Sequence, residues 1–146
     1  MERGSGGDGS VGDGTGARQR PDERWLRGVR GATTVERDEA PLVLEATREL
    51  LEAMLRENGI DAFEPIASIF FTTTPDLVST YPAEAARELG MDAVPLICNQ
   101  EIPVPGRVGR AIRVMLQLNT RKRQDEIVHV YLRGAKGLRP DIDSAQ

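Results

Sequence analysis

The chain has 146 residues, enough for one domain with a core of its own, and its formal net charge is −4. This acidic balance argues against nucleic acid as the main partner, because neutralising phosphates needs a basic face. One cysteine and one histidine allow neither a disulfide within the chain nor a Cys/His metal cluster. No apolar run approaches the roughly 20 residues that span a bilayer. We therefore expect a cytoplasmic protein, without membrane association, whose site works without metal, thiol chemistry or cofactor.

The first 24 residues differ in composition from the rest of the chain. They contain seven of the fifteen glycines, and Met1, Val11 and Ala17 are their only apolar residues. Such a segment cannot offset its ordering entropy by burial, and it has no apolar stretch of a secretory signal. We predict that 1–24 is a disordered extension and that order begins at Trp25.

The rest of the chain predicts strands with two helices interspersed and no complete βαβ repeat. It predicts strands at 25–30, 66–74, 93–98, 111–120 and 127–132, and helices at 39–58 and 82–89. The first helix is the clearest, because Pro41 suits a first turn, leucines recur at three- and four-residue steps, and Gly59 ends it. We expect a shaped loop at 100–109 and an irregular tail from 134. The order indicates an α+β fold, a mixed five-stranded sheet packed by helices.

Four side chains stand out from this framework. Arg113 sits in the middle of a strongly apolar strand, where a charge is costly unless it is paired. Arg30 is predicted to end the first strand, Glu101 follows a buried strand, and Tyr131 lies in the last strand. Taken singly, each also fits a structural role. Together they suit an anionic small molecule, since guanidinium groups bind carboxylates with two parallel hydrogen bonds.

Three further residues have ordinary interpretations. Cys98 is expected to be a small buried apolar residue and His129 a packing residue, while Arg87 fits a solvated helix face. Spacing alone therefore predicts an anion-binding domain and no particular reaction.

Several motifs recur in the order of a known family. They are RGVRGATTVE at 27–36, TPDL at 74–77, YPA at 81–83, ARE at 86–88, VP at 94–95, CNQE at 98–101, IRVM at 112–115, HVYL at 129–132 and LRPD at 138–141. From about residue 25 to 142 the chain resembles the monofunctional, AroH-type chorismate mutases. The resemblance implies a chorismate mutase domain over 25–142, followed by a C-terminal tail at 143–146.

The resemblance also implies an assembly and a reaction. Family members form a homotrimer that looks like an α/β-barrel, with active sites between neighbouring subunits. They convert chorismate to prephenate by a pericyclic rearrangement, in phenylalanine and tyrosine biosynthesis, without a cofactor. The implied catalytic residues are Arg113, Arg30, Glu101 and Tyr131, and the implied substrate-binding residues are Cys98, Arg87, Tyr81, Leu138 and Arg139.

The implied roles follow the charges of the substrate. Arg113 resembles the cation beside the ether oxygen, Arg30 and Tyr131 the ligands of the side-chain carboxylate, and Glu101 with Cys98 the pair that positions the ring hydroxyl. Two positions differ from a relative of this family. This chain has Tyr81 where the relative has phenylalanine, and Glu84 where the relative has lysine. The change at 84 leaves an alternative open, a non-catalytic trimeric sensor of an anionic metabolite.

Overall fold

The computed structural model describes residues 23–138, so residues 1–22 of the predicted extension at 1–24, Arg139 and the predicted tail at 143–146 lie outside the described residues. Its elements are β1 (Trp25–Thr34), α1 (Ala40–Glu57), β2 (Ile66–Thr73), α2 (Ala83–Glu88), β3 (Leu96–Gln100), β4 (Ala111–Thr120), the 3₁₀ turn η1 (Gln124–Glu126), β5 (Val130–Tyr131) and the 3₁₀ helix η2 (Arg133–Leu138). The five strands form one sheet in the order β3-β2-β4-β1-β5. This confirms the predicted mixed, five-stranded α+β fold.

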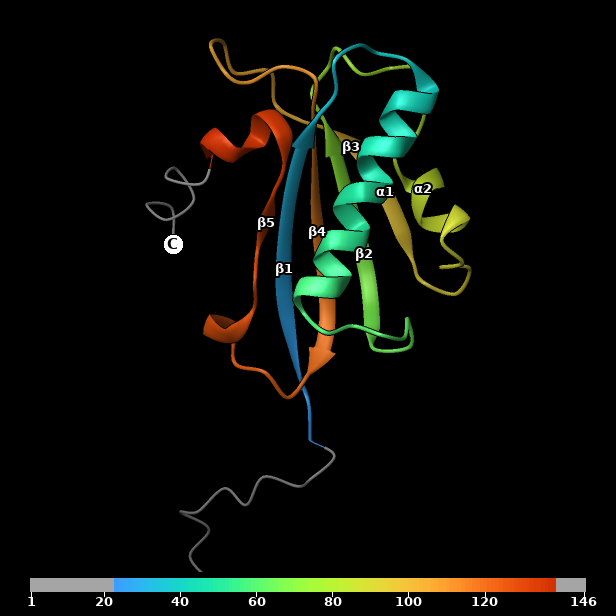
Figure 1. Ribbon diagram of the computed structural model, residues 1–146, viewed down its shortest axis with the longest axis vertical. Helices are drawn as coiled ribbons and strands as arrows, with labels where there is room; N and C mark the ends of the chain where they lie inside the picture. Colours follow the sequence, from blue (N-terminus) through green and yellow to red (C-terminus); the bar gives the residue numbers. More distant parts are fainter. Residues whose placement is uncertain (1–22, 139–146) are drawn as a thin grey trace, which may run out of the picture.

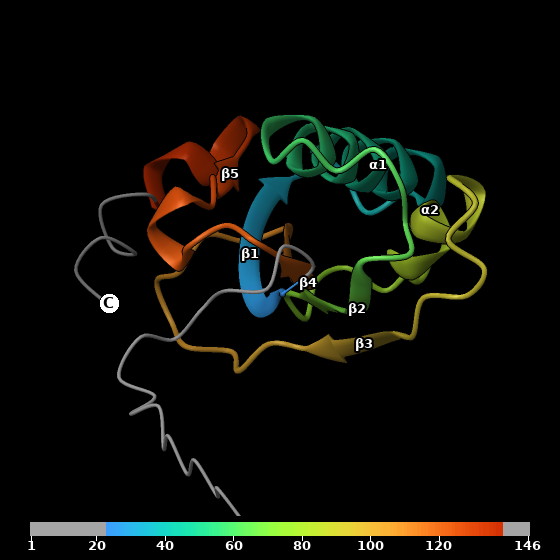
Figure 2. The ribbon, with the colours of Figure 1, turned by 90° about the horizontal axis from the view of Figure 1, so that it is seen from below.

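The sheet has one covered face and one open face. Both β1 and β2 run antiparallel to the central strand β4, while β3 is parallel to β2 and β5 is parallel to β1. Figures 1 and 2 show α1 and α2 on the same side of the sheet. The opposite face carries no α-helix among the described residues, and it is there that Arg30 and Arg113 lie.

The core lies between α1 and the covered face. Leu50, Leu51 and Met54 of α1 are completely buried in one cluster with Ile69 and Phe71 of β2. Burying one such side chain stabilises the fold by about 1.5–3 kcal/mol. The predicted alternation of β4 is confirmed, since its even-numbered residues 112–118 are buried and the odd-numbered ones reach the open face.

The predicted helix limits are close to the observed ones. Pro41 lies in the first turn of α1, and Gly59 follows the helix with a φ of 62°, a left-handed conformation that suits glycine. No helix within residues 23–138 is long and apolar enough to cross a membrane.

The first strand is longer than predicted. It continues to Thr34, so Arg30 lies in its middle and the prediction that Arg30 ends the strand is wrong. Gly31 does not end the strand either. It faces α1, where an added Cβ would lie 2.4 Å from Sδ of Met54. The glycine therefore serves close packing between helix and sheet.

The last strand is shorter than predicted, because side chains take over its pairing. Val128 exchanges two hydrogen bonds with the side-chain amide of Asn58, at the end of α1. Gln124 does the same with the backbone of Gly28 on β1. Only residues 130–131 form the β5 ladder, and the predicted irregular tail begins with η2. Similarly, β3 starts at Leu96 and not at residue 93, because a turn precedes Pro95, which has no N–H to donate.

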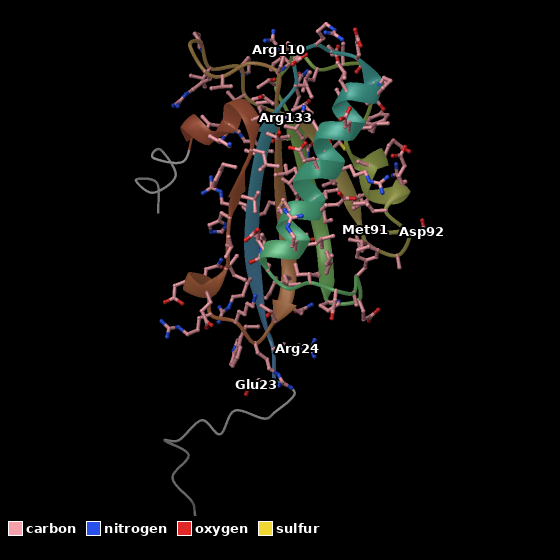
Figure 3. All side chains as sticks on the ribbon, in the orientation of Figure 1. Glu23, Arg24, Met91, Asp92, Arg110 and Arg133 are labelled. Atoms are coloured by element: carbon pink, nitrogen blue, oxygen red, sulfur yellow. The ribbon has the colours of Figure 1, made fainter. Side chains whose placement is uncertain are left out.

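Two turns near the C-terminal end of β1 each contain an arginine in an unusual backbone conformation. One turn precedes β4 and the other follows β5. Arg110 (φ 47°) and Arg133 (φ 51°), labelled in Figure 3, are the non-glycine residues with positive φ in the described chain. The backbone N–H of Arg110 donates to the Asp76 carboxylate, and the guanidinium of Arg133 pairs with Glu49 at 2.9 Å. These contacts fix where β4 begins and where η2 leaves β5.

Candidate active site

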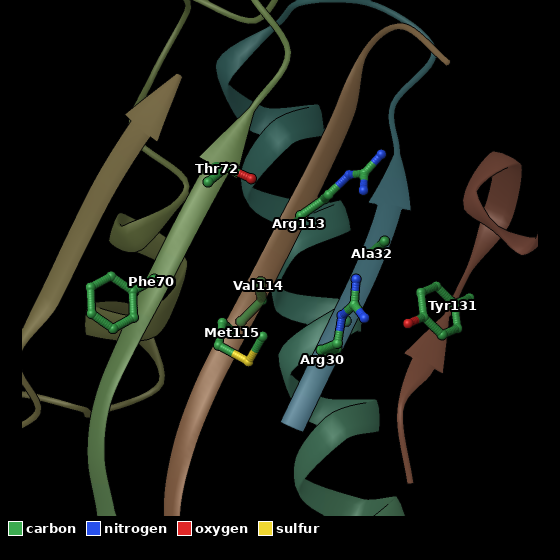
Figure 4. Close-up of a pocket in the computed structure, with 9 residues that line it drawn as sticks. Arg30, Ala32, Phe70, Thr72, Arg113, Val114, Met115 and Tyr131 are labelled. Carbon is green, nitrogen blue, oxygen red and sulfur yellow. The ribbon is translucent and has the colours of Figure 1, made fainter. Parts of the chain in front are cut away.

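The candidate site is a row of side chains across the open face of the sheet. In the strand register Thr72 of β2 stands opposite Arg113 of β4, Arg113 opposite Ala32 of β1, and Ala32 opposite Tyr131 of β5. Arg30 lies one pleat along, opposite Met115. Figure 4 shows Arg30, Arg113 and Tyr131 along this face, around a cavity of about 180 Å³. Strand register thus brings together three of the four predicted catalytic residues.

The fourth, Glu101, forms an ion pair with Arg113. Nε of Arg113 lies 3.0 Å from Oε1 of Glu101, although its N–H is not aligned with that oxygen. The Thr72 hydroxyl donates a 2.8 Å hydrogen bond to the same oxygen, and the backbone N–H of Glu101 donates to the Thr73 carbonyl. The side chain of Glu101 is 17% exposed. Arg113 is therefore held by a carboxylate that is itself anchored to β2.

A larger cavity continues from this row under the loop after β3. Its volume is about 720 Å³, and Arg30, Arg113 and Glu101 line it together with the loop residues Ile102 and Arg107. The predicted shaped loop thus forms one wall of the site. Both cavities share the two arginines, so an anion in either position meets fixed positive charge.

Three predicted substrate-binding residues lie elsewhere in the same chain. Tyr81 and Cys98 line a separate cavity of about 360 Å³ between β3 and the segment before α2. Arg87 of α2 is close enough to Cys98 to act on its thiol, and it forms an ion pair with Glu84. Burial raises the pKa of the Cys98 thiol, with a smaller opposing effect from Arg87. Within one chain Cys98 and Glu101 line different cavities, so their shared role at the ring hydroxyl stays a prediction.

Leu138, the last residue of η2, packs against neighbouring side chains. It is buried on η2 against Ala32 and Ala135, and the Tyr131 ring packs against this cluster. The N–H of Gly134 donates to the Thr34 hydroxyl, which docks η2 on β1. Leu138 therefore packs beside the Tyr131 ring, and its predicted place at the mouth of the site stays a prediction.

His129 was predicted to be a packing residue, and the structure assigns it a specific bond. Its Nδ1 accepts a 3.0 Å hydrogen bond from the backbone N–H of Arg30. Its place two residues before Tyr131 was the only sequence signal for this contact. Thr72 was likewise missed, since a threonine in a strand does not reveal which carboxylate it will meet.

The described residues contain no group of three or more His, Cys, Asp or Glu side chains placed to hold a metal ion. The candidate site combines the cations of Arg30 and Arg113, the anchored carboxylate of Glu101 and the phenol of Tyr131 on one face of the sheet. The fold and this site define a small α+β protein with a surface suited to a compact anion.

The comparisons narrow this class to one family. The chain matches the family model of chorismate mutase type I over residues 26–142. It is 54% identical over 121 residues to "Chorismate mutase AroH" of Thermus thermophilus, covering 83% of this chain and 99% of the relative. It is 45% identical over 118 residues to the AroH protein of Bacillus subtilis (strain 168), covering 80% of this chain and 92% of the relative. The chain therefore belongs to the type I chorismate mutase family.

The fold agrees with this assignment. A solved structure of a chorismate mutase from Clostridium thermocellum superposes on the chain with a TM-score of 0.75 at 45% sequence identity. The match covers 76% of this chain and 98% of that structure.

Proposed function

We propose that this chain is a chorismate mutase, an isomerase that rearranges chorismate to prephenate in aromatic amino acid biosynthesis. The observation that carries this proposal is the placement of Arg113. Its charge lies on the open face of the sheet, paired with Glu101 and one pleat from a second arginine, Arg30. Family membership supplies the substrate, and this geometry supplies a way to accelerate its reaction.

Arg113 acts on the bond that breaks. In the rearrangement the ether C–O bond lengthens before the new C–C bond is complete, so negative charge grows on the ether oxygen. A cation fixed beside that oxygen stabilises the transition state more than the ground state, which is the requirement for catalysis. The anchored carboxylate of Glu101 keeps the guanidinium from reorienting during the reaction.

The other residues select a reactive conformation. Arg30 and Tyr131, on neighbouring strands, bind the side-chain carboxylate, while Glu101 accepts a hydrogen bond from the ring hydroxyl. Thr72 and Arg113 both contact Oε1 of Glu101, which leaves Oε2 for the substrate. Holding the two ends of chorismate together removes extended conformers that cannot react.

We also propose that the working site forms between subunits of a homotrimer. Two separated half-sites in one chain support this. One half-site comprises Arg30, Arg113, Glu101 and Tyr131, and the other comprises Tyr81, Cys98 and Arg87. The open face also exposes large apolar side chains that a neighbouring subunit would bury, namely Leu26, Phe70, Ile97 and Met115. A closed ring joins the two half-sites of different copies at every boundary.

Complementation between inactive variants tests this assembly. Arg113→Ala and Arg87→Ala each damage one half-site, and co-expression of the two produces mixed trimers. With random assembly about a quarter of the sites contain two intact halves, so about a quarter of wild-type turnover is expected. Co-expressing Arg113→Ala with Arg30→Ala is the matched control. Both changes lie in the same half-site, so this pair has no intact site to form.

The loss of chorismate ultraviolet absorbance measures turnover in each case. Equal, negligible turnover in both mixtures would mean that the half-sites do not join. Binding of chorismate by the wild-type protein without turnover would favour a sensor over an enzyme.

We further propose a cytoplasmic location, because a reducing compartment suits the free, half-buried thiol of Cys98. Cell fractionation tests this location.

A further inference from the structure

We propose that His129 is a positioning residue that keeps Arg30 and Tyr131 in register, and that protonation of His129 weakens substrate binding. The inference rests on the proposed function, because it assigns those two residues to the substrate carboxylate. It concerns a different property, the pH range over which Arg30 and Tyr131 keep the relative position that binds the substrate carboxylate.

The hydrogen bond to Arg30 specifies one form of the imidazole. Nδ1 of His129 accepts the Arg30 N–H at 3.0 Å, so Nδ1 carries a lone pair. The ring is then neutral, with its proton on Nε2. Once protonated, both ring nitrogens are donors, and Nδ1–H would face the N–H of Arg30. The bond cannot survive protonation.

This bond lies where β1 and β5 are otherwise weakly joined. Going along β1, Gly28 pairs with the Gln124 side chain, Arg30 with the His129 ring, and the Ala32 carbonyl with the N–H of Leu132. The ladder itself consists of two residue pairs. On the N-terminal side of this short ladder, the His129 ring is therefore the first side-chain connection, and losing it lets Tyr131 shift relative to Arg30.

The surroundings of His129 favour its neutral form. Burial lowers the pKa of His129, and the positive charge of Arg30 lowers it further. The cavity that His129 lines also contains Arg56 and Glu57 of α1, Lys136 of η2 and Tyr131 of its own segment. The positive charges of Arg30, Arg56 and Lys136 outnumber the negative charge of Glu57, so the surroundings as a whole favour the neutral ring.

Because the pKa of His129 is lowered, the sign of its effect on stability with pH can be stated. Since the folded state lowers the pKa of His129 below its usual 6.5, the neutral ring stabilises the fold above pH 6.5. That contribution is lost as the pH falls through the lowered value. Arg113 is anchored separately by Glu101 and Thr72. We therefore expect acid to raise KM for chorismate while kcat changes little.

The experiment compares three proteins from pH 8 down to below the titration midpoint of the His129 ring. Wild-type KM is expected to rise about fivefold as the pH falls through that midpoint, the effect of one lost hydrogen bond. In His129→Asn the amide oxygen can accept the same N–H and does not titrate, so KM should stay near the wild-type neutral value throughout. His129→Phe fills the space without an acceptor, and its KM should be raised at every pH.

Two activity results would overturn the proposal: a wild-type KM that stays flat across the His129 midpoint, or the same acid rise in His129→Asn. A nitrogen NMR titration gives a readout independent of activity, because the chain contains a single histidine. It should show the Nε2–H form at pH 7.5 and an Arg30 amide signal that moves with the same midpoint as the ring; an Nδ1–H form would contradict the model. Absence of chorismate turnover at pH 7.5 would refute the proposed function, while this titration would still decide the role of His129.

Discussion

Replacing Arg113 by alanine is the most direct test of how the site works. The change removes the cation proposed to lie at the ether oxygen. Removing one preorganised electrostatic group aimed at developing charge costs roughly 2.7–4 kcal/mol in the transition state, or about a hundred- to thousandfold in kcat. We expect a loss of that size in Arg113→Ala, measured from the disappearance of chorismate absorbance.

The same substitution also disturbs the fold, and the structure indicates by how much. It removes the 3.0 Å ion pair to Glu101, whose carboxylate then keeps its hydrogen bond from Thr72. An incompletely paired, mostly buried group costs about 1–3 kcal/mol, and partial solvent screening places this case at the lower end. Unfolding must therefore be followed by circular dichroism, so that lost activity is not confused with lost structure.

Two companion variants sharpen the test. Arg113→Lys keeps a charge but not the planar fork, so it should recover less than about a tenth of the lost activity. Arg48→Ala removes an exposed arginine of α1, paired with Glu52 at 3.0 Å, and should leave turnover unchanged. Near-normal kcat in a folded Arg113→Ala protein would refute the electrostatic mechanism. Full recovery in Arg113→Lys would show that charge alone suffices and that guanidinium geometry does not matter.

Three further changes probe other parts of the molecule. Gly31→Ala places a Cβ 2.4 Å from Sδ of the buried Met54, and it should destabilise the fold by about 1–2 kcal/mol in chemical unfolding; unchanged stability would show that the core yields easily. Glu84→Gln releases Arg87 from its ion pair and should raise kcat/KM severalfold at low salt but not at high salt; no salt-dependent gain would contradict a substrate-facing Arg87. Deleting residues 2–22 should leave turnover unchanged, because the family match begins at residue 26; a large loss would assign that segment a role in activity.

The fold was largely predictable, because its elements are marked by local patterns. The limits of α1 followed from Pro41 and Gly59, and the two faces of β4 from strict alternation. The end of β1 was not predictable. A glycine after a short apolar run usually signals a turn. Only the position of the Met54 side chain shows that Gly31 instead lets α1 pack closely against β1. The extent of β5 likewise depends on Asn58, which is 70 residues distant from Val128 in the sequence.

Some residues of the candidate site could also be predicted from local sequence, and others could not. Arg113 could be identified because a charge in an apolar strand requires a partner, and Glu101 proved to be that partner. The grouping of Arg30 with Arg113 depends on strand register, which the motifs implied only through the resemblance. The contact of His129 with the backbone of Arg30 is a long-range pairing with no local pattern, so the sequence alone predicted only packing.

The side-chain pairing along β1 has a consequence for how the protein avoids aggregation. An exposed strand edge with unpaired N–H and C=O groups is a template on which other chains can add. On β1 the edge groups of Gly28 are occupied by the Gln124 amide, and the N–H of Arg30 is occupied by His129. A foreign strand would have to displace both side chains before it could extend the sheet. The side chains that join the β5 segment to β1 thus also protect this edge against strand addition.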